Sequence, residues 1–372
     1  MDRAKLFEAL GELAPLSLAE SWDNVGLLVG EASGELAGPV LCTIDLTEAV
    51  MDEAEQIGCS TIIAYHPPIF VPFKRIVCSD TKQRLVHRAI RAGMSVYSPH
   101  TALDAAQDGL NDWLISGFGS GDVRSLKPST ERDDLHKIVT FVPTQDVERV
   151  RNALASAGAG HIGAYDLCSF GVIGTGTFRG ESGTNPTIGK AGEFTSVEEM
   201  RLEMVCSEDA VALAIETLRA FHPYEEPAID VFKIEPLPER NTGHGRRIVL
   251  DQPLTTMEIA EKLKTHLGVT RLKLTAPKGD HGQKLSHIGV CAGSGGDLAS
   301  VAATNGCEMY ITGEMTHHQV MAHLDRGLGI ILAGHTNTER GYLPILASKL
   351  KKKLPGLDVR VSSADRSQLE WV

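Results

Sequence analysis

The sequence predicts an α/β fold with mostly parallel sheets and flanking helices, interrupted by a ferredoxin-like α+β insert. Short β-type runs alternate with helical segments between residues 39 and 100, and the alternation returns from residue 285 onward. Glycine-rich β-type segments in a different order separate the two halves. We therefore expect a discontinuous α/β domain at residues 1–128 and 241–372, with an inserted domain at residues 129–240.

The first half contains three expected strands and three expected helices. The strands are expected at residues 39–45, 60–66 and 94–100, and the helices at residues 48–58, 81–93 and 102–119. The first two helices end on glycine, and the third has apolar residues at helical spacing. Strand–helix–strand units of this size imply right-handed crossovers and a mostly parallel sheet.

The elements of the insert and of the second half can be predicted from the same kinds of pattern. Segment 126–134 is expected to be an exit loop and segment 235–246 a return linker, because both are polar and rich in turn residues. Between them we expect a strand–helix pair, two glycine-rich strands, a helix and a last strand, an order typical of ferredoxin-like modules. In the second half, strands are expected at 285–293, 307–313, 328–335 and 357–365, and helices at 297–306, 314–327 and 336–354.

Composition excludes several classes of protein. The 372 residues carry a net charge of −12, which argues against nucleic acid as the main partner because nucleic-acid binders usually present a basic face. The seven cysteines include no C-x-x-C pair, which favours reduced cysteines and a cytoplasmic protein. No apolar run is long enough for a membrane span.

Histidines stand at three expected strand ends: His66, His100 and His335. Asp104 follows His100, and Glu339 follows His335, each by four residues. Because the carboxyl ends of parallel strands share one edge of a sheet, these residues could converge. Imidazole and carboxylate ligands without thiolate suit Zn, Fe, Mn, Ni or Co, with one or two ions per subunit.

Simpler interpretations stay open for each of these residues. A histidine at a strand end is often a hydrogen-bonded core residue, and Asp104 would also be favoured as an acid in a first helical turn. Glu339 could form a capping box with Thr336. The repetition of the same arrangement at two strand ends favours the metal site.

Further candidates lie nearby in the sequence. Glu314, His317 and His318 occupy a fourth strand–helix corner and are candidates for proton transfer or substrate contact. The glycine-rich segment 291–296 could hold an anion. Segment 22–26, WDNVG, is expected to be a structural loop, and segment 221–227, FHPYEEP, a fixed turn over a cleft, at a subunit contact, or in solvent.

These motifs together resemble the Nif-three-like family, whose bacterial members carry the name GTP cyclohydrolase I type 2 homologue. The segments that carry the resemblance are SWDNVGLLVG, YHPPIF, SPHTALDAA, CAGSGG, YITGEMTHH, GHTNTERGYL and SSADR. The insert, with HPYEEPAID, resembles the module related to PII and CutA proteins that many members carry.

The resemblance implies a two-metal centre inside a ring-shaped homohexamer. Its implied ligands are His66, Asp104, His335 and Glu339, with Glu339 as the bridge between ions. Many bacterial members carry two consecutive histidines where this chain has Tyr65 and His66, so this chain is similar to the eukaryotic branch. His100 and Tyr65 are the further candidate ligands for a second ion.

Two hypotheses about function follow. The first is a metal-dependent hydrolase that attacks a phosphoester or a purine-type C–N bond of a nucleotide-like small molecule. In it, Glu314, His317 or His318 would move the proton. The second is a non-enzymatic, metal-handling or regulatory hexamer whose insert senses a ligand or partner.

Overall fold

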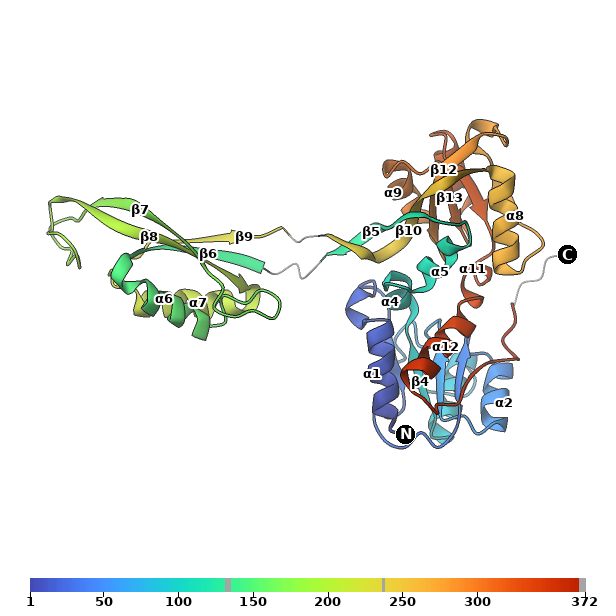
Figure 1. Cartoon of the computed structure of the whole chain (residues 1–372). Coiled ribbons are helices and arrows are strands. Elements are labelled where there is room, and N and C mark those ends of the chain that lie inside the picture. Colours follow the sequence, from blue (N-terminus) through green and yellow to red (C-terminus); the bar gives the residue numbers. More distant parts are fainter. Residues whose placement is uncertain (131–134, 236–237, 368–372) are drawn as a thin grey trace. The chain divides into compact units, whose positions relative to one another are not determined.

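The computed structural model describes residues 1–130, 135–235 and 238–367 and divides the chain into two compact units (Figure 1). Unit 1 comprises Met1–Ser129 and Glu239–Val372, and unit 2 comprises Thr130–Pro238. Each unit has its own buried apolar cluster. Within the described residues, no helix is long and apolar enough to cross a membrane.

The first sheet of unit 1 has the strand order β1-β4-β3-β2-β15. Its strands are β1 (Gly26–Val29), β2 (Val40–Thr43), β3 (Thr61–Ala64), β4 (Ser95–Ser98) and β15 (Val359–Val361). Strands β4, β3, β2 and β15 run parallel, and β1 is antiparallel at the edge. The strands predicted at residues 39–45, 60–66 and 94–100 are confirmed. Strands β2, β3 and β4 are buried throughout, as expected for a parallel sheet covered on both faces.

The second sheet of unit 1 has the strand order β11-β14-β13-β12-β10-β5. Strands β12, β13 and β14 run parallel, whereas β11 and β10 are antiparallel to their neighbours β14 and β12. The strands are β5 (Gly121–Thr130), β10 (Pro238–Thr255), β11 (Lys273–Thr275), β12 (Lys284–Cys291), β13 (Met309–Thr312) and β14 (Gly329–Leu332).

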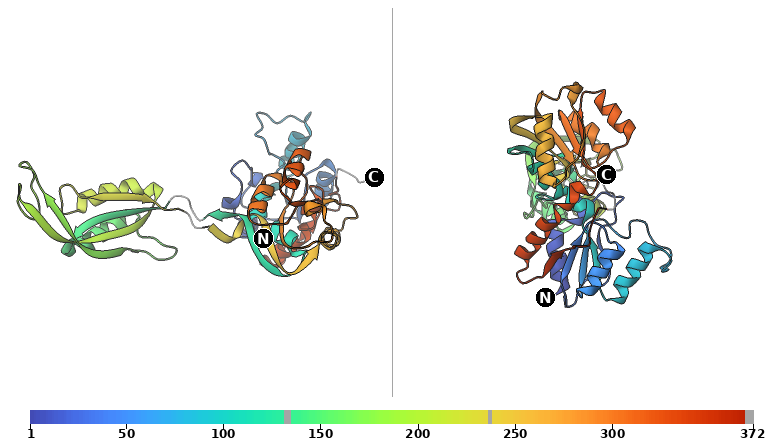
Figure 2. Two further views of the ribbon diagram at one scale, coloured as in Figure 1. Left: turned by 90° about the horizontal axis from the view of Figure 1, so that it is seen from above. Right: turned by 90° about the vertical axis from the view of Figure 1, so that its right-hand side faces the viewer.

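One hydrophobic core joins these two sheets. Cys42 and Ile63 from the first sheet belong to the same buried cluster as Ile311 and Ile331 from the second. The helices that complete the unit are α1 (Arg3–Leu13), α2 (Glu48–Gln56), α3 (Thr81–Arg91), α4 (His100–Ala105), α5 (Leu110–Ser116), α8 (Thr256–Leu267), α9 (Ala299–Thr304), α10 (His317–Leu324), α11 (Asn337–Arg340) and α12 (Leu343–Lys353). The right-hand view of Figure 2 shows the two sheets as two lobes, one largely blue and one largely orange.

Two helices predicted as continuous are each broken. The helix predicted at residues 102–119 is α4 followed by α5, because Asp108 adopts a positive φ of 55° and Gly109 packs where a Cβ would meet the Leu103 carbonyl oxygen at 2.2 Å. The helix predicted at residues 336–354 is α11 followed by α12. Gly341 separates them at a point where a Cβ would stand 2.4 Å from the Trp113 ring. In both places tight packing, not propensity, ends the helix.

The two predicted joins are also different from expectation. Residues 126–130 belong to β5 and residues 238–246 to β10, so these parts of the predicted exit loop and return linker are strands. Residues 131–134 and 236–237 of the two joins lie outside the described residues. β5 and β10 are neighbours in the second sheet, and β5 is its edge strand. Backbone hydrogen bonds hold such strands together, so a polar sequence can still form them.

Unit 2 is a four-stranded antiparallel sheet with two helices on one face. Along the chain its elements are β6 (Leu135–Pro143), α6 (Val147–Ser156), β7 (Phe170–Arg179), β8 (Phe194–Ser207), α7 (Glu208–Phe221) and β9 (Ile229–Lys233). The strand order is β7-β8-β6-β9. Residues of α6 and α7, such as Leu154 and Leu218, pack on Ile138 of β6 and Leu202 of β8.

We predict that unit 1 folds without unit 2. A short Gly/Ser linker can replace residues 130–238, because the strands on either side of them lie close together. Gly243 of β10 packs against the backbone of Lys127 and Ser129 in β5. The melting temperature of unit 1 should change by less than about 5 °C, the shift that 1–2 kcal/mol produces in a domain of this size. An unfolded product in circular dichroism would show that the units depend on each other.

Candidate metal centre

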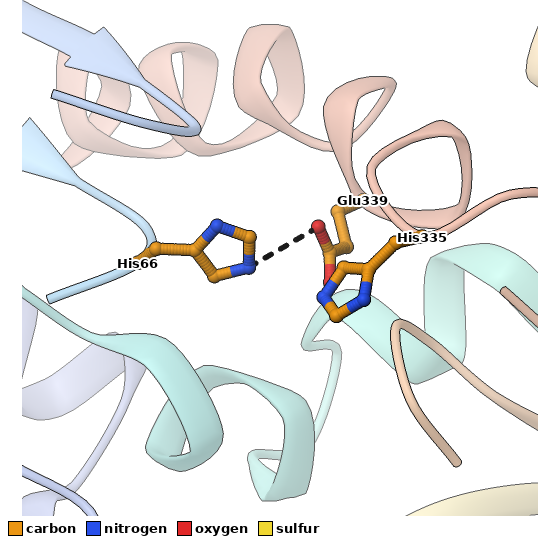
Figure 3. A group of neighbouring side chains, drawn as sticks. All are labelled: His66, His335 and Glu339. Carbon is orange, nitrogen blue, oxygen red and sulfur yellow. Dashed lines mark ion pairs between the residues drawn. The ribbon is translucent and has the colours of Figure 1, made fainter. Parts of the chain in front are cut away.

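Three side chains from distant parts of the sequence meet where β3 and β14 end (Figure 3). His66 follows β3, His335 follows β14, and Glu339 lies in α11. Nε2 of His66 is 3.4 Å from Glu339 Oε2, and Nε2 of His335 is 3.3 Å from Glu339 Oε1. One ligand atom from each residue can be chosen so that all three lie within 4.8 Å of one another.

The burial of these atoms fits a cation-binding site. The Glu339 side chain is only 2% exposed. His66 Nε2 and Glu339 Oε2 are both buried, and neither makes a hydrogen bond within the described part of the chain. Buried polar atoms are normally hydrogen-bonded, and these two have only each other, as an ion pair at 3.4 Å. A divalent cation satisfies both, and imidazole with carboxylate suits Zn, Fe, Mn, Ni or Co.

Each of the two histidines is held by a carboxylate at its other ring nitrogen. His66 Nδ1 donates to Asp45 Oδ1 at 2.9 Å, and His335 Nδ1 donates to Glu314 Oε1 at 2.7 Å. A carboxylate can only accept, which assigns the proton to Nδ1 and turns Nε2 toward Glu339. This is the arrangement by which carboxylates orient metal-binding histidines and raise their basicity.

A third histidine–carboxylate pair lies beside the first two. His100 is the first residue of α4, and its ring centre is 5.4 Å from that of His66. Its Nδ1 donates to both carboxylate oxygens of Asp23 at 2.8 Å, and Asp23 also accepts from the backbone and the hydroxyl of Thr101. His100 has a positive φ of 24°, a conformation that this network holds in place.

Asp104 and Tyr65 form the last part of the cluster. The Tyr65 hydroxyl donates to Asp104 Oδ1 at 2.6 Å. Burial, with the Glu339 charge also contributing, raises the pKa of Asp104 to about 6. Burial and the same neighbouring carboxylates hold the pKa of Tyr65 well above its usual value, so this phenol stays a donor.

The charges of the central group are strongly coupled. Burial lowers the pKa of His66, but the hydrogen bond to Asp45 and the Glu339 carboxylate outweigh it and raise the pKa to about 10. Contact with Glu339, against the effect of burial, raises the pKa of His335 to about 9. Burial raises the pKa of Glu339, yet the two histidines bring it below its ordinary value. Without metal, protons on the imidazoles therefore balance the buried carboxylate.

The structure brings some of the candidate residues together and leaves others apart. Near one another it places six of them: Tyr65, His66, His100, Asp104, His335 and Glu339. Glu314 contacts the group through His335, whereas His317 and His318 are exposed at the start of α10. In the described part of the chain, no hydrogen bond or ion pair joins these two histidines to His66, His335 or Glu339.

Two of the interpretations drawn from the sequence are wrong, the capping box and the anion site. The Thr336 side chain does not cap α11, so Glu339 forms no capping box with it. Residues 22–25 form a loop before β1, as predicted, and Asp23 of this loop orients His100. In segment 291–296 the backbone N–H groups of Gly293 and Gly295 already donate to threonine hydroxyls, which leaves them unavailable to an anion.

Sequence reasoning missed Asp45 and Asp23. Asp45 stands two residues after β2, so the same rule about strand ends that selected the histidines would have selected it. Asp23 lies between elements, and no periodicity or spacing marks it.

Comparisons of the sequence with family models and with known proteins point to the same family. The family model of Duf34/NIF3 (NGG1p interacting factor 3) matches residues 1–368. The GTP cyclohydrolase 1 type 2 homolog of Halalkalibacterium halodurans is 35% identical over 341 residues, which covers 92% of this chain and 90% of that protein. The NIF3-like protein 1 of Bos taurus is 34% identical over 379 residues, covering 100% and 93%.

Solved structures resemble the chain over its whole length. The Bacillus cereus protein related to NIF3 superimposes with a TM-score of 0.65 at 31% identity, covering 100% of this chain and 99% of that chain. The Staphylococcus aureus protein SA1388 gives a TM-score of 0.77 at 25% identity with the same coverage. The family resemblance read from the motifs is thereby confirmed.

We predict that metal binding releases protons. At pH 7 both His66 and His335 carry the Nε2 protons that an ion must displace, because their pKa values are about 10 and about 9. Calorimetric titration with Zn²⁺ in two buffers of different ionisation enthalpy should report about two protons released per first ion. Affinity should rise with pH until about pH 10, where the imidazole of higher pKa, His66, also loses its proton. Binding without proton release would contradict this charge balance.

We also predict that Gly293 is required beside the centre. A Cβ there would stand 2.7 Å from Glu339 Oε1 and 3.1 Å from His335 Nε2. Gly293→Ala should weaken Zn²⁺ binding about tenfold or more. Gly306→Ala is the matched control, since both glycines have positive φ (63° and 80°) but a Cβ at Gly306 meets nothing within 4 Å. Equal affinity losses in the two variants would count against a tight centre.

Proposed function

Since this chain belongs to the Duf34/NIF3 family, we propose that it is a cytoplasmic, divalent-metal-dependent hydrolase of a nucleotide-like or phosphoester small molecule. The observation that carries the proposal is the buried Glu339 carboxylate placed between the Nε2 atoms of two oriented histidines. The name GTP cyclohydrolase 1 type 2 homolog, which four bacterial relatives bear, supports a substrate of nucleotide type. The cysteines of the chain are all free thiols, as suits a reducing compartment.

The first ion would be held by His66, His335 and Glu339. Asp104 would join Glu339 in holding a second ion, after exchanging the Tyr65 hydroxyl for the metal. Tyr65 and His100 would border that second position, since their ring centres lie 5.0 Å and 5.4 Å from the ring centre of His66. Two carboxylates and two imidazoles are a donor set that suits a pair of divalent ions.

The bound metal would supply Lewis-acid activation of water and of a substrate oxygen at neutral pH. The chain itself would contribute orientation and proton transfer. His100 is held by Asp23 through Nδ1, which leaves Nε2 as its ring nitrogen for proton transfer, and Glu314 accepts a hydrogen bond from His335 Nδ1. Both are suited to move a proton during hydrolysis, and both are better placed for it than the exposed His317 and His318.

We propose further that the chain forms a homo-oligomer, with a hexamer as the expected state, and that unit 2 is a separable ferredoxin-like module. The element order strand–helix–strand–strand–helix–strand and the sheet order of unit 2 support the second point. Large exposed apolar residues support the first: Tyr165, Ile173 and Phe194 are 76%, 59% and 72% exposed.

Activity should depend on Glu339 and, more weakly, on Asp45. Metal-loaded protein would be screened against nucleotides, GTP and phosphoesters, with Glu339→Gln and Asp45→Asn compared at equal protein and total metal. Glu339→Gln should abolish activity and first-ion binding, because it removes the central charge. Asp45→Asn keeps the ligands but weakens the hold on His66, so metal affinity should fall about 10–100-fold.

Exposed Glu181→Gln is the control and should change neither property. Hydrolysis that survives Glu339→Gln would refute the proposed site. Tight stoichiometric metal binding without turnover of any substrate would instead favour a metal-handling protein.

A further inference from the structure

Unit 2 contains a cavity of about 600 Å³ on the face of its sheet that carries no helix. Phe141, Arg201 and Val172 are register partners across β6, β8 and β7 and line this cavity. Their sequence neighbours Val142 and Leu202 belong to the core under α6 and α7. Side chains alternate across a strand, so the cavity lies on the opposite face from the helices. Its volume is in the range of small-molecule sites.

The cavity has a fixed wall built from the FHPYEEP segment and the loop after β7. The backbone N–H of Asn185 donates to Glu225 Oε1 at 3.1 Å, and the Thr187 hydroxyl donates to the Pro223 carbonyl. His222 is buried, and its Nε2 donates to the Phe141 carbonyl at 3.1 Å. These bonds attach the turn to the sheet and the loop to the turn, so the cavity is formed before any ligand binds.

Glu199 supplies the polar group at the base of the cavity. Its side chain lies in the lining, the residue is 9% exposed, and Oε1 accepts a hydrogen bond of 2.7 Å from the Tyr224 hydroxyl. Within the described residues, Oε2 has no protein donor. It lies above Gly176, where a Cβ would stand only 1.9 Å away, so the absence of a side chain at Gly176 makes room for this carboxylate.

The charge of the lining is negative. Glu225 and Glu226 join Glu199, and Arg201 is the one basic residue among the lining residues. Arg201 is already paired with Glu203 at 2.8 Å. A phosphate or carboxylate ligand would meet three carboxylates here, whereas a cation would gain a partner for Glu199 Oε2.

We propose that this cavity binds a small organic cation, an amine with an aromatic or apolar body. The ammonium group contacts Glu199, and the body lies between Phe141, Phe178 and Val172, which line the cavity. Tyr224 holds the carboxylate toward the ligand. This site belongs to unit 2 and is independent of the hydrolase proposed for unit 1.

Gly174 sets the space available to the body of the ligand. It lines the cavity within β7, and a Cβ at this position meets nothing within 4 Å. Gly174→Val therefore places its Cβ in open space at the cavity lining and reduces the volume left for a ligand. A strand position also accepts valine readily, so the variant should fold.

Three probes with one indole body separate charge from shape: tryptamine, its alcohol tryptophol, and indole-3-propionate. Binding to the full-length chain would be measured by ligand-observed NMR titration. Tryptamine should bind with a Kd of about 1 mM, typical for a ligand of this size. Tryptophol should bind about tenfold more weakly, and the anion more weakly still.

Two variants and one control test the residues. Glu199→Gln should weaken tryptamine binding about tenfold and leave tryptophol unchanged, and Gly174→Val should remove binding of both. Glu198→Gln, the same change at the adjacent exposed residue outside the lining, should have no effect. The proposal is overturned by equal or tighter binding of the anion, by unaltered tryptamine binding in Glu199→Gln or Gly174→Val, or by no saturable tryptamine binding.

Discussion

The contact between the buried Glu339 carboxylate and the two imidazoles of His66 and His335 is the interaction on which unit 1 depends for its chemistry. A carboxylate that is 2% exposed needs a positive partner, and the histidines facing it are half-buried groups from two different sheets. These partners meet only because one hydrophobic core holds both sheets together. Fold and site are therefore linked: the core fixes the positions of β3 and β14, and the ends of those strands fix the ligands.

Close backbone packing makes this meeting possible. Gly293 leaves room for Glu339 and His335, and a Cβ at Gly313 would stand 2.7 Å from the His335 Cα. Around this tight centre, Asp45 and Glu314 hold the outer nitrogens of the two histidines, while Asp23 holds His100. The ring orientations are thus set before a metal arrives, which lowers the reorganisation that binding requires.

Much of this arrangement could be predicted from the sequence, because apolar strands that end on histidine place chemistry at one sheet edge. That rule selected His66, His100 and His335, and the four-residue spacing added Glu339. It did not predict that Tyr65 would donate to Asp104, since a hydrogen bond between residues 39 positions apart depends on packing. Asp23 was missed because its loop has no period. The breaks at Gly109 and Gly341 were missed because contacts with distant residues decide them.

The most direct test of the central claim is anomalous diffraction from crystals of the chain loaded with Zn²⁺, recorded on both sides of the zinc absorption edge. The account predicts a strong anomalous peak within bonding distance, about 2.0–2.2 Å, of His66 Nε2, His335 Nε2 and a Glu339 oxygen. A fully loaded crystal with its zinc elsewhere, and with Glu339 still contacting only the two histidines, would contradict it.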